Sequence, residues 1–144
     1  MNTQALELQP GGVSLADLRR IHAGGITLSL DPGAGAGIAA AQATVDRIVA
    51  GGEVVYGINT GFGKLAQTTI PHERLAELQR NLVLSHSVGT GAPLSDAVVR
   101  LVLATKAVSL ARGHSGVRPE IIDALLALFN AGVLPRIQIG RAHV

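Results

Sequence analysis

Residues 95–112 constrain the fold more than any other part of the sequence. Ser95 and Asp96 are typical of a helix start, and Gly113 follows as a stop. Between them the chain is almost entirely aliphatic, so a helix here is apolar on nearly every face. Such a helix must be buried in a bundle or between subunits. We therefore expect packed helices to form the framework of the molecule.

The core of this fold must be aliphatic. Hydrophobic residues make up 47% of the chain and aromatic residues only 2%, so Leu, Val, Ile and Ala have to fill it. The 144 residues suit one ordinary domain or a piece of a larger one. The apolar helix faces exceed what this length can cover by itself, so we expect further chain, tight oligomerisation or both.

Hydrophobic spacing and end signals predict the remaining elements. Alternating residues indicate short strands near the amino terminus, and Gly33–Gly37 is interpreted as a flexible turn. The sequence predicts a mainly α fold with strands at 7–9 and 26–30, an extended segment at 53–56, and helices from Ser14 to Gly24, from Ile38 to Ala50, from Pro71 to before Gly89, from Ser95 to Arg112 and from Pro119 to Asn130.

Composition argues against several classes of function. The formal charge is only +2 and the basic residues are scattered, which disfavours nucleic-acid binding. The chain has no cysteine, and its histidines lack metal-ligand spacing, so we expect no metal site. No apolar run reaches the roughly 20 residues that cross a bilayer, and no signal-peptide pattern opens the chain. We expect a cytoplasmic protein without membrane contact.

Two glycine-rich stretches resemble nucleotide-binding loops, but each lacks a required residue. Ile38 stands where the dinucleotide fingerprint needs its last small residue, and Leu65 stands where a phosphate loop needs Ser or Thr. We expect no nucleotide cofactor.

The only tyrosine lies in an unusual setting. Residues 56–63 read Tyr-Gly-Ile-Asn-Thr-Gly-Phe-Gly, with glycine at three of eight positions. Spacing alone leaves two interpretations open: a tight surface turn with an aromatic anchor, or a loop that carries Tyr56 to a reacting atom. His86 is similarly ambiguous, because it ends an apolar helical stripe and could be a hydrogen-bonded core residue or a functional one.

Longer motifs resemble a known family, which the spacing of single residues does not reveal. The segments 56–63 and 78–86, the latter reading Leu-Gln-Arg-Asn-Leu-Val-Leu-Ser-His, closely resemble the aromatic amino acid ammonia-lyases and aminomutases in order and separation. Residues 109–116, Ser-Leu-Ala-Arg-Gly-His-Ser-Gly, also resemble that family. The resemblance covers residues 5–137 and is strongest to the amino-terminal part of the histidine-directed members.

This resemblance implies a helical-bundle fold similar to that of aspartases and fumarases. It implies a homotetramer whose active sites combine residues from several subunits. It also implies a 4-methylidene-imidazol-5-one electrophile that forms autocatalytically from an internal Ala-Ser-Gly. In that chemistry the substrate adds to the electrophile, a base removes a β-proton and ammonia leaves.

The resemblance also assigns roles to individual residues. Tyr56 matches the family's loop tyrosine, the expected catalytic base, and a free phenol would need activation by positive charge or hydrogen bonding in the assembled site. Ser85 and His86 match the substrate-selecting pair, and Ser-His at this place implies L-histidine as substrate. Gly57, Gly61 and Gly63 are expected to give the loop the mobility to close over substrate. The implied reaction converts L-histidine to trans-urocanate and ammonia, the first step of histidine degradation.

The carboxyl-terminal part departs from the family pattern. No Ala-Ser-Gly occurs in the chain, and the spacing after Leu-Pro-Arg-Ile at 134–137 places that triplet beyond residue 144. Residues 138–144, Gln-Ile-Gly-Arg-Ala-His-Val, correspond to the translation of a common short-read sequencing adapter. We interpret 1–137 as the incomplete amino-terminal region of an ammonia-lyase and 138–144 as non-native sequence. A divergent natural ending is the alternative.

Three functional interpretations follow. The first is a histidine-deaminating parent enzyme, of which this chain is a piece that we expect to be inactive alone. The second is a phenylalanine or tyrosine ammonia-lyase or aminomutase, which differs from the first in its product. The third is a non-catalytic helical module that only oligomerises with related subunits, an interpretation favoured by the missing Ala-Ser-Gly.

Overall fold

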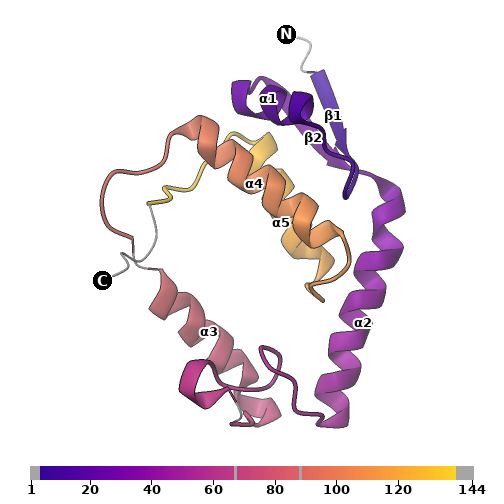
Figure 1. Ribbon diagram of the computed structural model, residues 1–144, viewed down its shortest axis with the longest axis vertical. Helices are drawn as coiled ribbons and strands as arrows, with labels where there is room; N and C mark the ends of the chain where they lie inside the picture. The colour runs from indigo at the N-terminus through magenta and orange to yellow at the C-terminus, as the bar shows by residue number, and fades with distance from the viewer. Residues whose placement is uncertain (1–3, 67, 88, 139–144) are drawn as a thin grey trace.

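The computed structural model describes residues 4–66, 68–87 and 89–138. In these residues a small parallel sheet is followed by a mainly helical chain, which confirms the predicted fold class (Figure 1). Short 3₁₀ turns precede α2, lie in the loop after it and precede α3. The strands and helices are β1 Gln4–Leu8, α1 Leu15–Ala23, β2 Ile26–Leu30, α2 Gly35–Gly51, α3 Leu75–His86, α4 Asp96–Ala111 and α5 Pro119–Asn130.

The sheet and α1 form one β-α-β unit. β1 pairs with β2 in parallel, from Gln4 opposite Ile26 to Leu8 opposite Leu30. The predicted strand at 7–9 is therefore wrong in its bounds. The backbone carbonyl of Gln9 accepts a hydrogen bond from the Gly12 N–H at 2.9 Å, so the chain already turns there.

α1 begins with the predicted capping box. The Ser14 hydroxyl accepts from the Asp17 backbone N–H at 3.2 Å, and the Asp17 carboxylate accepts from the Ser14 backbone N–H at 3.1 Å. At the other end, Arg100 of α4 donates to the carbonyls of Ile21 and His22, at 3.2 and 2.7 Å. These bonds satisfy carbonyls that the helix end leaves open, and they fix α1 on α4.

The core lies where the β-α-β unit meets α4 and α5. α4 buries one face against these elements, while Val98 and Val102 on the same helix stay 36% and 37% exposed. The helix is thus buried on one side only within the described chain. The buried aliphatic and aromatic side chains are Leu8, Ile21, Leu28, Ile38, Val99, Leu103, Ala104, Ala107, Leu110, Ala111, Ile122, Leu126 and Phe129.

Asn130, at the end of α5, ties that helix to the sheet. Its side-chain oxygen accepts from the Leu28 N–H at 2.7 Å, and its amide nitrogen donates to the Leu28 carbonyl at 2.8 Å. Both polar groups of one β2 residue are therefore paired by a single side chain, on the side of β2 that β1 does not cover.

α2 starts earlier than predicted. The Asp31 carboxylate accepts from the Gly33 N–H at 2.8 Å, and Pro32 opens a 3₁₀ turn that runs directly into the helix at Gly35. Interpreting Gly33–Gly37 as a flexible turn was therefore wrong, because this local bonding sets up the helix start. Further along, α2 buries only Ile38.

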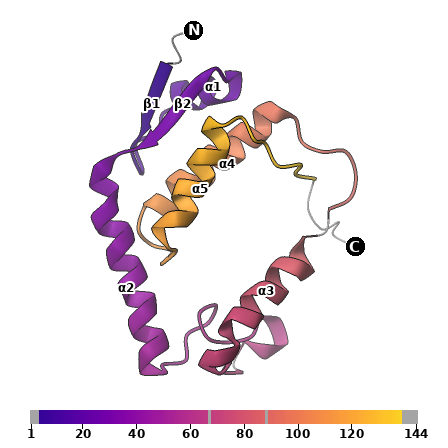
Figure 2. The same cartoon turned by 180° about the vertical axis from the view of Figure 1, so that it is seen from behind.

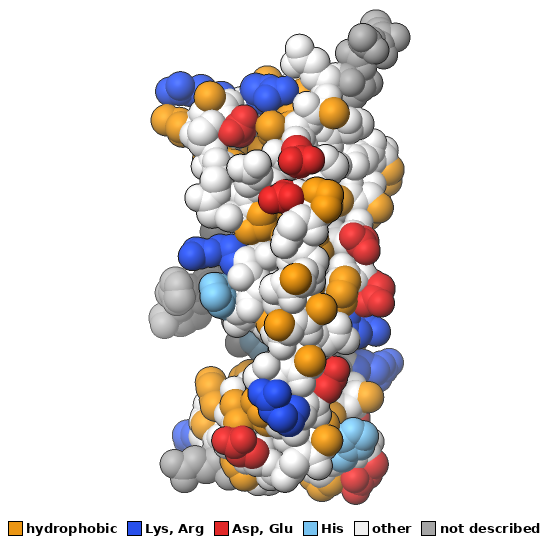
Figure 3. All heavy atoms as spheres, turned by 90° about the vertical axis from the view of Figure 1, so that its right-hand side faces the viewer, with side chains coloured by type: hydrophobic (Ala, Val, Ile, Leu, Met, Phe, Trp, Pro, Cys, Tyr) orange, Lys and Arg blue, Asp and Glu red, His pale blue; other side chains and the backbone are white. Residues whose placement is uncertain are grey.

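α2 extends away from the core, and the loop after it and α3 lie apart from the sheet (Figures 1 and 2). In Figures 1 and 2, α2 runs down one side of the molecule away from the sheet, and α3 returns along the other. Figure 3 shows apolar side chains on the outer surface around α2, among charged ones. The predicted helix from Pro71 is instead a 3₁₀ turn followed by α3, and none of the residues of α3 is buried. Its apolar stripe, Leu75, Leu78 and Leu82, is only half-buried.

Candidate active site

The loop between α2 and α3 presents Tyr56 at the corner of a turn. The Ile58 N–H donates to the Val55 carbonyl at 3.1 Å, which closes a four-residue turn with Tyr56 second and Gly57 third. Gly57 has φ = 81°, as the third position of a type II turn requires, and this angle favours glycine. The predicted extended segment at 53–56 therefore ends in a turn, and Tyr56 is 62% exposed.

The base of this loop is buried and fully bonded. Asn59 is only 5% exposed: its side-chain oxygen accepts from the Val55 N–H at 2.9 Å, and its amide donates to the Glu53 carbonyl at 2.7 Å. Thr60, 1% exposed, forms an isolated antiparallel bridge with Thr69. An exposed crown at 56–57 thus stands on an ordered base.

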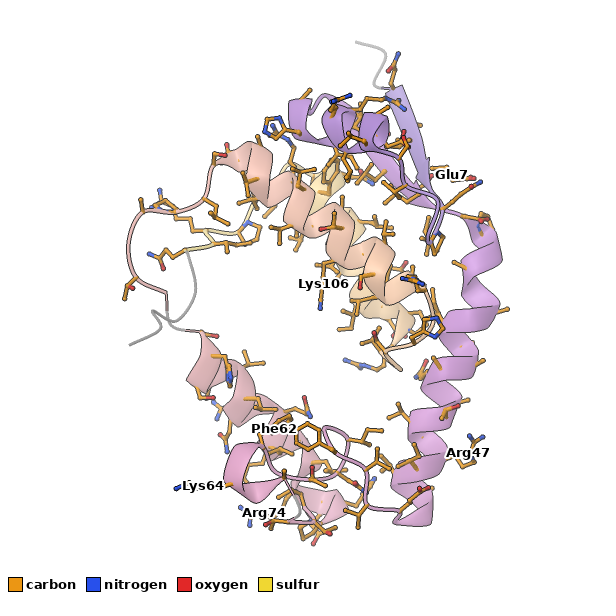
Figure 4. All side chains as sticks on the ribbon, viewed as in Figure 1. Glu7, Arg47, Phe62, Lys64, Arg74 and Lys106 are labelled. Carbon is orange, nitrogen blue, oxygen red and sulfur yellow. The ribbon has the colours of Figure 1, made fainter. Side chains whose placement is uncertain are left out.

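Phe62 is the aromatic neighbour of Tyr56. The two rings meet edge to face, with centroids 5.8 Å apart and an interplanar angle of 64°. Figure 4 shows Phe62 in the loop that joins α2 to α3, at the end of the molecule away from the sheet. The Tyr56 ring is therefore in contact with a second aromatic side chain of the same loop.

The three loop glycines occupy different positions. Gly57 lies in the exposed crown, whereas Gly61 lies in the base, where its N–H donates to the Thr68 carbonyl at 3.0 Å. Gly63, with φ = 58°, begins a 3₁₀ turn. Their expected contribution to loop closure stays a prediction.

Ser85 and His86 lie in the last turn of α3, and both are exposed. His86 Nδ1 lies 2.9 Å from the Leu82 carbonyl oxygen and 3.0 Å from the Ser85 hydroxyl. A carbonyl can only accept, so we assign the ring proton to Nδ1. In the neutral imidazole, Nε2 is then an acceptor. The exposed helix end can therefore offer it to a donor group of a ligand.

Tyr56 and His86 lie on different elements. Tyr56 belongs to the loop that leads into α3 and packs on Phe62, whereas His86 is the last residue of α3. Within the described residues no hydrogen bond joins the two side chains.

Sequence reasoning gave no role to Asn59, Thr60 or Phe62. A polar Asn-Thr pair inside a glycine-rich loop was a signal that could have been followed, because such residues often bond the local backbone. What the sequence did not show is that the Asn59 side chain reaches back to Glu53 and Val55.

Other features of the described chain bear on the expected cofactors. Among the described residues no group of His, Cys, Asp and Glu could hold a metal ion. No helix within the described ranges is long and apolar enough to span a membrane. The sequence has no Ala-Ser-Gly, so no residues of this chain can be matched to the electrophile's precursor. Of the suspected non-native residues 138–144, Gln138 forms an isolated antiparallel bridge with Pro93, and 139–144 lie outside the described ranges.

The helical fold and the loop between α2 and α3 that carries Tyr56, here called the tyrosine loop, together define a class of protein. The chain belongs to the aromatic amino acid lyase family, whose model matches residues 13–140. This finding confirms the resemblance inferred from residues 56–63 and 78–86.

Individual members of this family are similar to the chain to different degrees. The chain is 74% identical to histidine ammonia-lyase from Paracidovorax citrulli over 130 residues, 90% of this chain and 25% of that protein. It superimposes on the crystal structure of histidine ammonia-lyase from Trypanosoma cruzi with a TM-score of 0.81 and 41% identity, over 92% of this chain and 26% of that one. Tyrosine aminomutase from Streptomyces globisporus gives a TM-score of 0.86 with 29% identity, over 94% and 26%.

These relatives share the fold but differ in sequence similarity. The chain spans about a quarter of the length of the curated relatives it matches. The TM-scores are alike for the lyase and the aminomutase, so the fold alone does not separate the two activities. Sequence identity does favour one of them, the histidine-directed enzymes.

Proposed function

We propose that this chain forms the amino-terminal part of an enzyme that converts L-histidine to trans-urocanate and ammonia. The observation that carries the proposal is the 74% identity to a histidine ammonia-lyase over 90% of this chain. The family relationship supports a C–N lyase as the parent protein. Residues 1–137 would be the native part of that enzyme, and its cytoplasmic location stays a prediction.

Tyr56 is the proposed catalytic base. Its phenolate oxygen takes a proton from the β-carbon of histidine. The electron pair of the broken C–H bond becomes the double bond between Cα and Cβ as the Cα–N bond breaks, and the nitrogen leaves as ammonia. The exposed turn at 55–58 supports this role, because it presents the phenol outward from an ordered base.

His86 is the proposed recognition residue for the substrate ring. With Nδ1–H bonded to the Leu82 carbonyl, Nε2 can accept a hydrogen bond from the N–H of a substrate imidazole. Phenylalanine and tyrosine carry no ring N–H, so this contact would favour histidine. Ser85, bonded to the same carbonyl at 3.1 Å, supports the orientation of the imidazole.

The rest of the active site belongs to the longer protein. A methylidene-imidazolone formed from an Ala-Ser-Gly outside this chain would withdraw electrons from the substrate and make its β-proton removable. The proposed enzyme is a homotetramer whose sites combine residues from several copies, as the family relationship implies. The exposed apolar side chains of α3, including Val83 at 64%, support contacts beyond this chain.

A hybrid enzyme tests the proposed function. Residues 1–137 replace the matching amino-terminal quarter of the Paracidovorax citrulli enzyme, and the hybrid is incubated separately with L-histidine, L-phenylalanine and L-tyrosine. We expect urocanate and ammonia from histidine, and a loss of about 100-fold or more in kcat for Tyr56→Phe, in line with removal of a general base.

The unmodified Paracidovorax citrulli enzyme is the control. If it is active while the hybrid gives no urocanate, this chain does not support histidine deamination. Cinnamate, coumarate or a β-amino acid as the main product would instead favour the phenylalanine- or tyrosine-directed alternative. Full activity of Tyr56→Phe would overturn the assignment of the base.

A further inference from the structure

We propose that Asn59 is the positioning residue that fixes the phenol of Tyr56 for reaction. The inference rests on the proposed function and extends it to a side chain that does not itself touch substrate. It begins from a contrast in burial: Tyr56 is 62% exposed, whereas Asn59, three residues later, is 5% exposed. Apart from its edge-to-face contact with Phe62, such an exposed ring has little packing to hold it, so its place depends strongly on the backbone beneath it.

Asn59 bonds that backbone on both sides of Val55. Its side-chain oxygen accepts from the Val55 N–H at 2.9 Å, and its own backbone N–H donates to the Val55 carbonyl at 3.3 Å. Val55 immediately precedes Tyr56. Both polar backbone groups of this residue are therefore bonded by one asparagine, which restricts the direction in which the chain enters the turn.

Two further bonds extend this control to the rest of the loop. The Asn59 amide donates to the Glu53 carbonyl at 2.7 Å, where the chain enters the loop from α2. The Asn59 carbonyl accepts from the Ile70 N–H at 2.9 Å, where the chain leaves the loop toward α3. Asn59 thus joins both ends of the loop to the turn that carries Tyr56, and we call this set of bonds the Asn59 clamp.

The clamp has a direct consequence for the reaction. Tyr56 itself takes part in none of these bonds, so its side chain can adjust while the clamp holds the backbone on both sides of it. A displacement of a reacting group by about 1 Å can cost on the order of 100-fold in rate, because reaction depends on near-attack geometry. Loss of the two side-chain bonds of the clamp should therefore lower kcat far more than it weakens substrate binding.

Asn130 provides a matched control within the same chain. Like Asn59, its side chain accepts from one backbone N–H and donates to one backbone carbonyl, here both of Leu28, at 2.7 and 2.8 Å. It lies between α5 and β2, and it has no bond to the tyrosine loop. Asn130→Ala therefore removes an equivalent structural contact without touching the Asn59 clamp.

The experiment compares Asn59→Ala, Asn59→Ser and Asn130→Ala in the hybrid enzyme. We expect kcat for histidine to fall about 30- to 100-fold in Asn59→Ala with KM within about threefold, because the transition-state geometry is lost. Asn59→Ser keeps one polar oxygen, disturbs folding less and should show a smaller loss. Asn130→Ala should retain kcat in the folded enzyme.

Hydrogen exchange supplies a readout that does not need activity. Peptides that cover residues 53–61 should exchange about 10-fold faster in Asn59→Ala, since two of their backbone groups lose a partner, while peptides from α4 stay unchanged. In Asn130→Ala the faster exchange should instead appear around β2.

The possible outcomes separate the clamp from the proposed function. An unchanged kcat in Asn59→Ala, or an equal loss in Asn130→Ala, overturns the positioning role. If the hybrid acts on none of the three amino acids, the proposed function fails and exchange alone decides the clamp. Unchanged exchange over residues 53–61 then refutes it as well.

Discussion

Gly113 lies against the backbone of Gly37 so closely that a Cβ at position 113 would stand 2.7 Å from the Gly37 carbonyl carbon and oxygen. This contact places the loop after α4 directly on the first turn of α2. Gly113 also has φ = 73°, which favours glycine. Close approach and backbone angle together require glycine here. From the sequence, residues 109–116 were known only to resemble the ammonia-lyase family.

Gly113→Ala should destabilise the chain by more than about 2 kcal/mol, because it adds a clash with a backbone to the roughly 1–2 kcal/mol cost of the left-handed angle. Gly132→Ala is the matched control, since Gly132 has φ = 68° but open space around the added methyl group. Urea unfolding followed by circular dichroism measures both. Equal losses in the two variants would show that the Gly37 contact adds nothing.

Gly116→Ala should also destabilise, through a clash with the Val45 side chain of α2. A side chain can be shortened where a backbone cannot, so Val45→Ala should recover part of the loss. The double-mutant cycle is expected to give a coupling of about 0.5–3 kcal/mol between the two positions. Strictly additive free energies of unfolding would contradict a direct contact.

Asn130→Ala should lower the free energy of unfolding by about 1–3 kcal/mol, because it leaves the N–H and carbonyl of Leu28 without their partner. Asn81→Ala on the exposed surface of α3 is the control and should change stability by less than about 0.5 kcal/mol. Chemical unfolding reports both. If the two variants have the same free energy of unfolding, the hydrogen bonds from Asn130 of α5 to Leu28 of β2 do not stabilise the protein.

The capping box of α1 should make stability depend on pH. The Ser14 hydroxyl, the Ser14 backbone N–H and the nearby Arg20 lower the pKa of Asp17 below its ordinary value of 3.8. A lowered folded-state pKa stabilises the protein above pH 3.8, and this contribution disappears as the pH falls through the lower folded value. Asp17→Asn should therefore be less stable than the unmodified chain at neutral pH, and the difference should shrink in acid.

Unfolding curves for the two proteins from neutral pH to below pH 3.8 test this capping effect. A difference that stays constant over that range would exclude the Asp17 carboxylate as its source.

His86→Leu in the hybrid enzyme should lower kcat/KM for histidine by about 10- to 100-fold, because it removes the proposed acceptor for the substrate N–H. Ser87→Ala is the control: the Ser87 hydroxyl donates only to the Val83 carbonyl of its own helix. Urocanate formation at several histidine concentrations measures both variants. Unchanged kcat/KM in His86→Leu would remove this residue from substrate recognition.

The sequence predicted the bounds of an element well where interactions between neighbouring residues set them, and less well where other contacts set them. The start of α1 at Ser14 and the extent of α4 were predicted well, since caps and hydrophobic spacing act within a few residues. The starts of β1 and α2 were misplaced. β1 depends on pairing with β2, and α2 depends on how Asp31 bonds Gly33.

The sequence by itself determined the helical class, the family and the glycine-bearing loop around Tyr56, because these follow from composition, periodicity and uninterrupted motifs. Only the tertiary structure decided that the Asn59 side chain bonds Val55 and that Gly113 lies against the backbone of Gly37. The physical reason is that these contacts join separate segments of the chain. The relative positions of such segments are set by close packing and by the need to pair buried backbone groups.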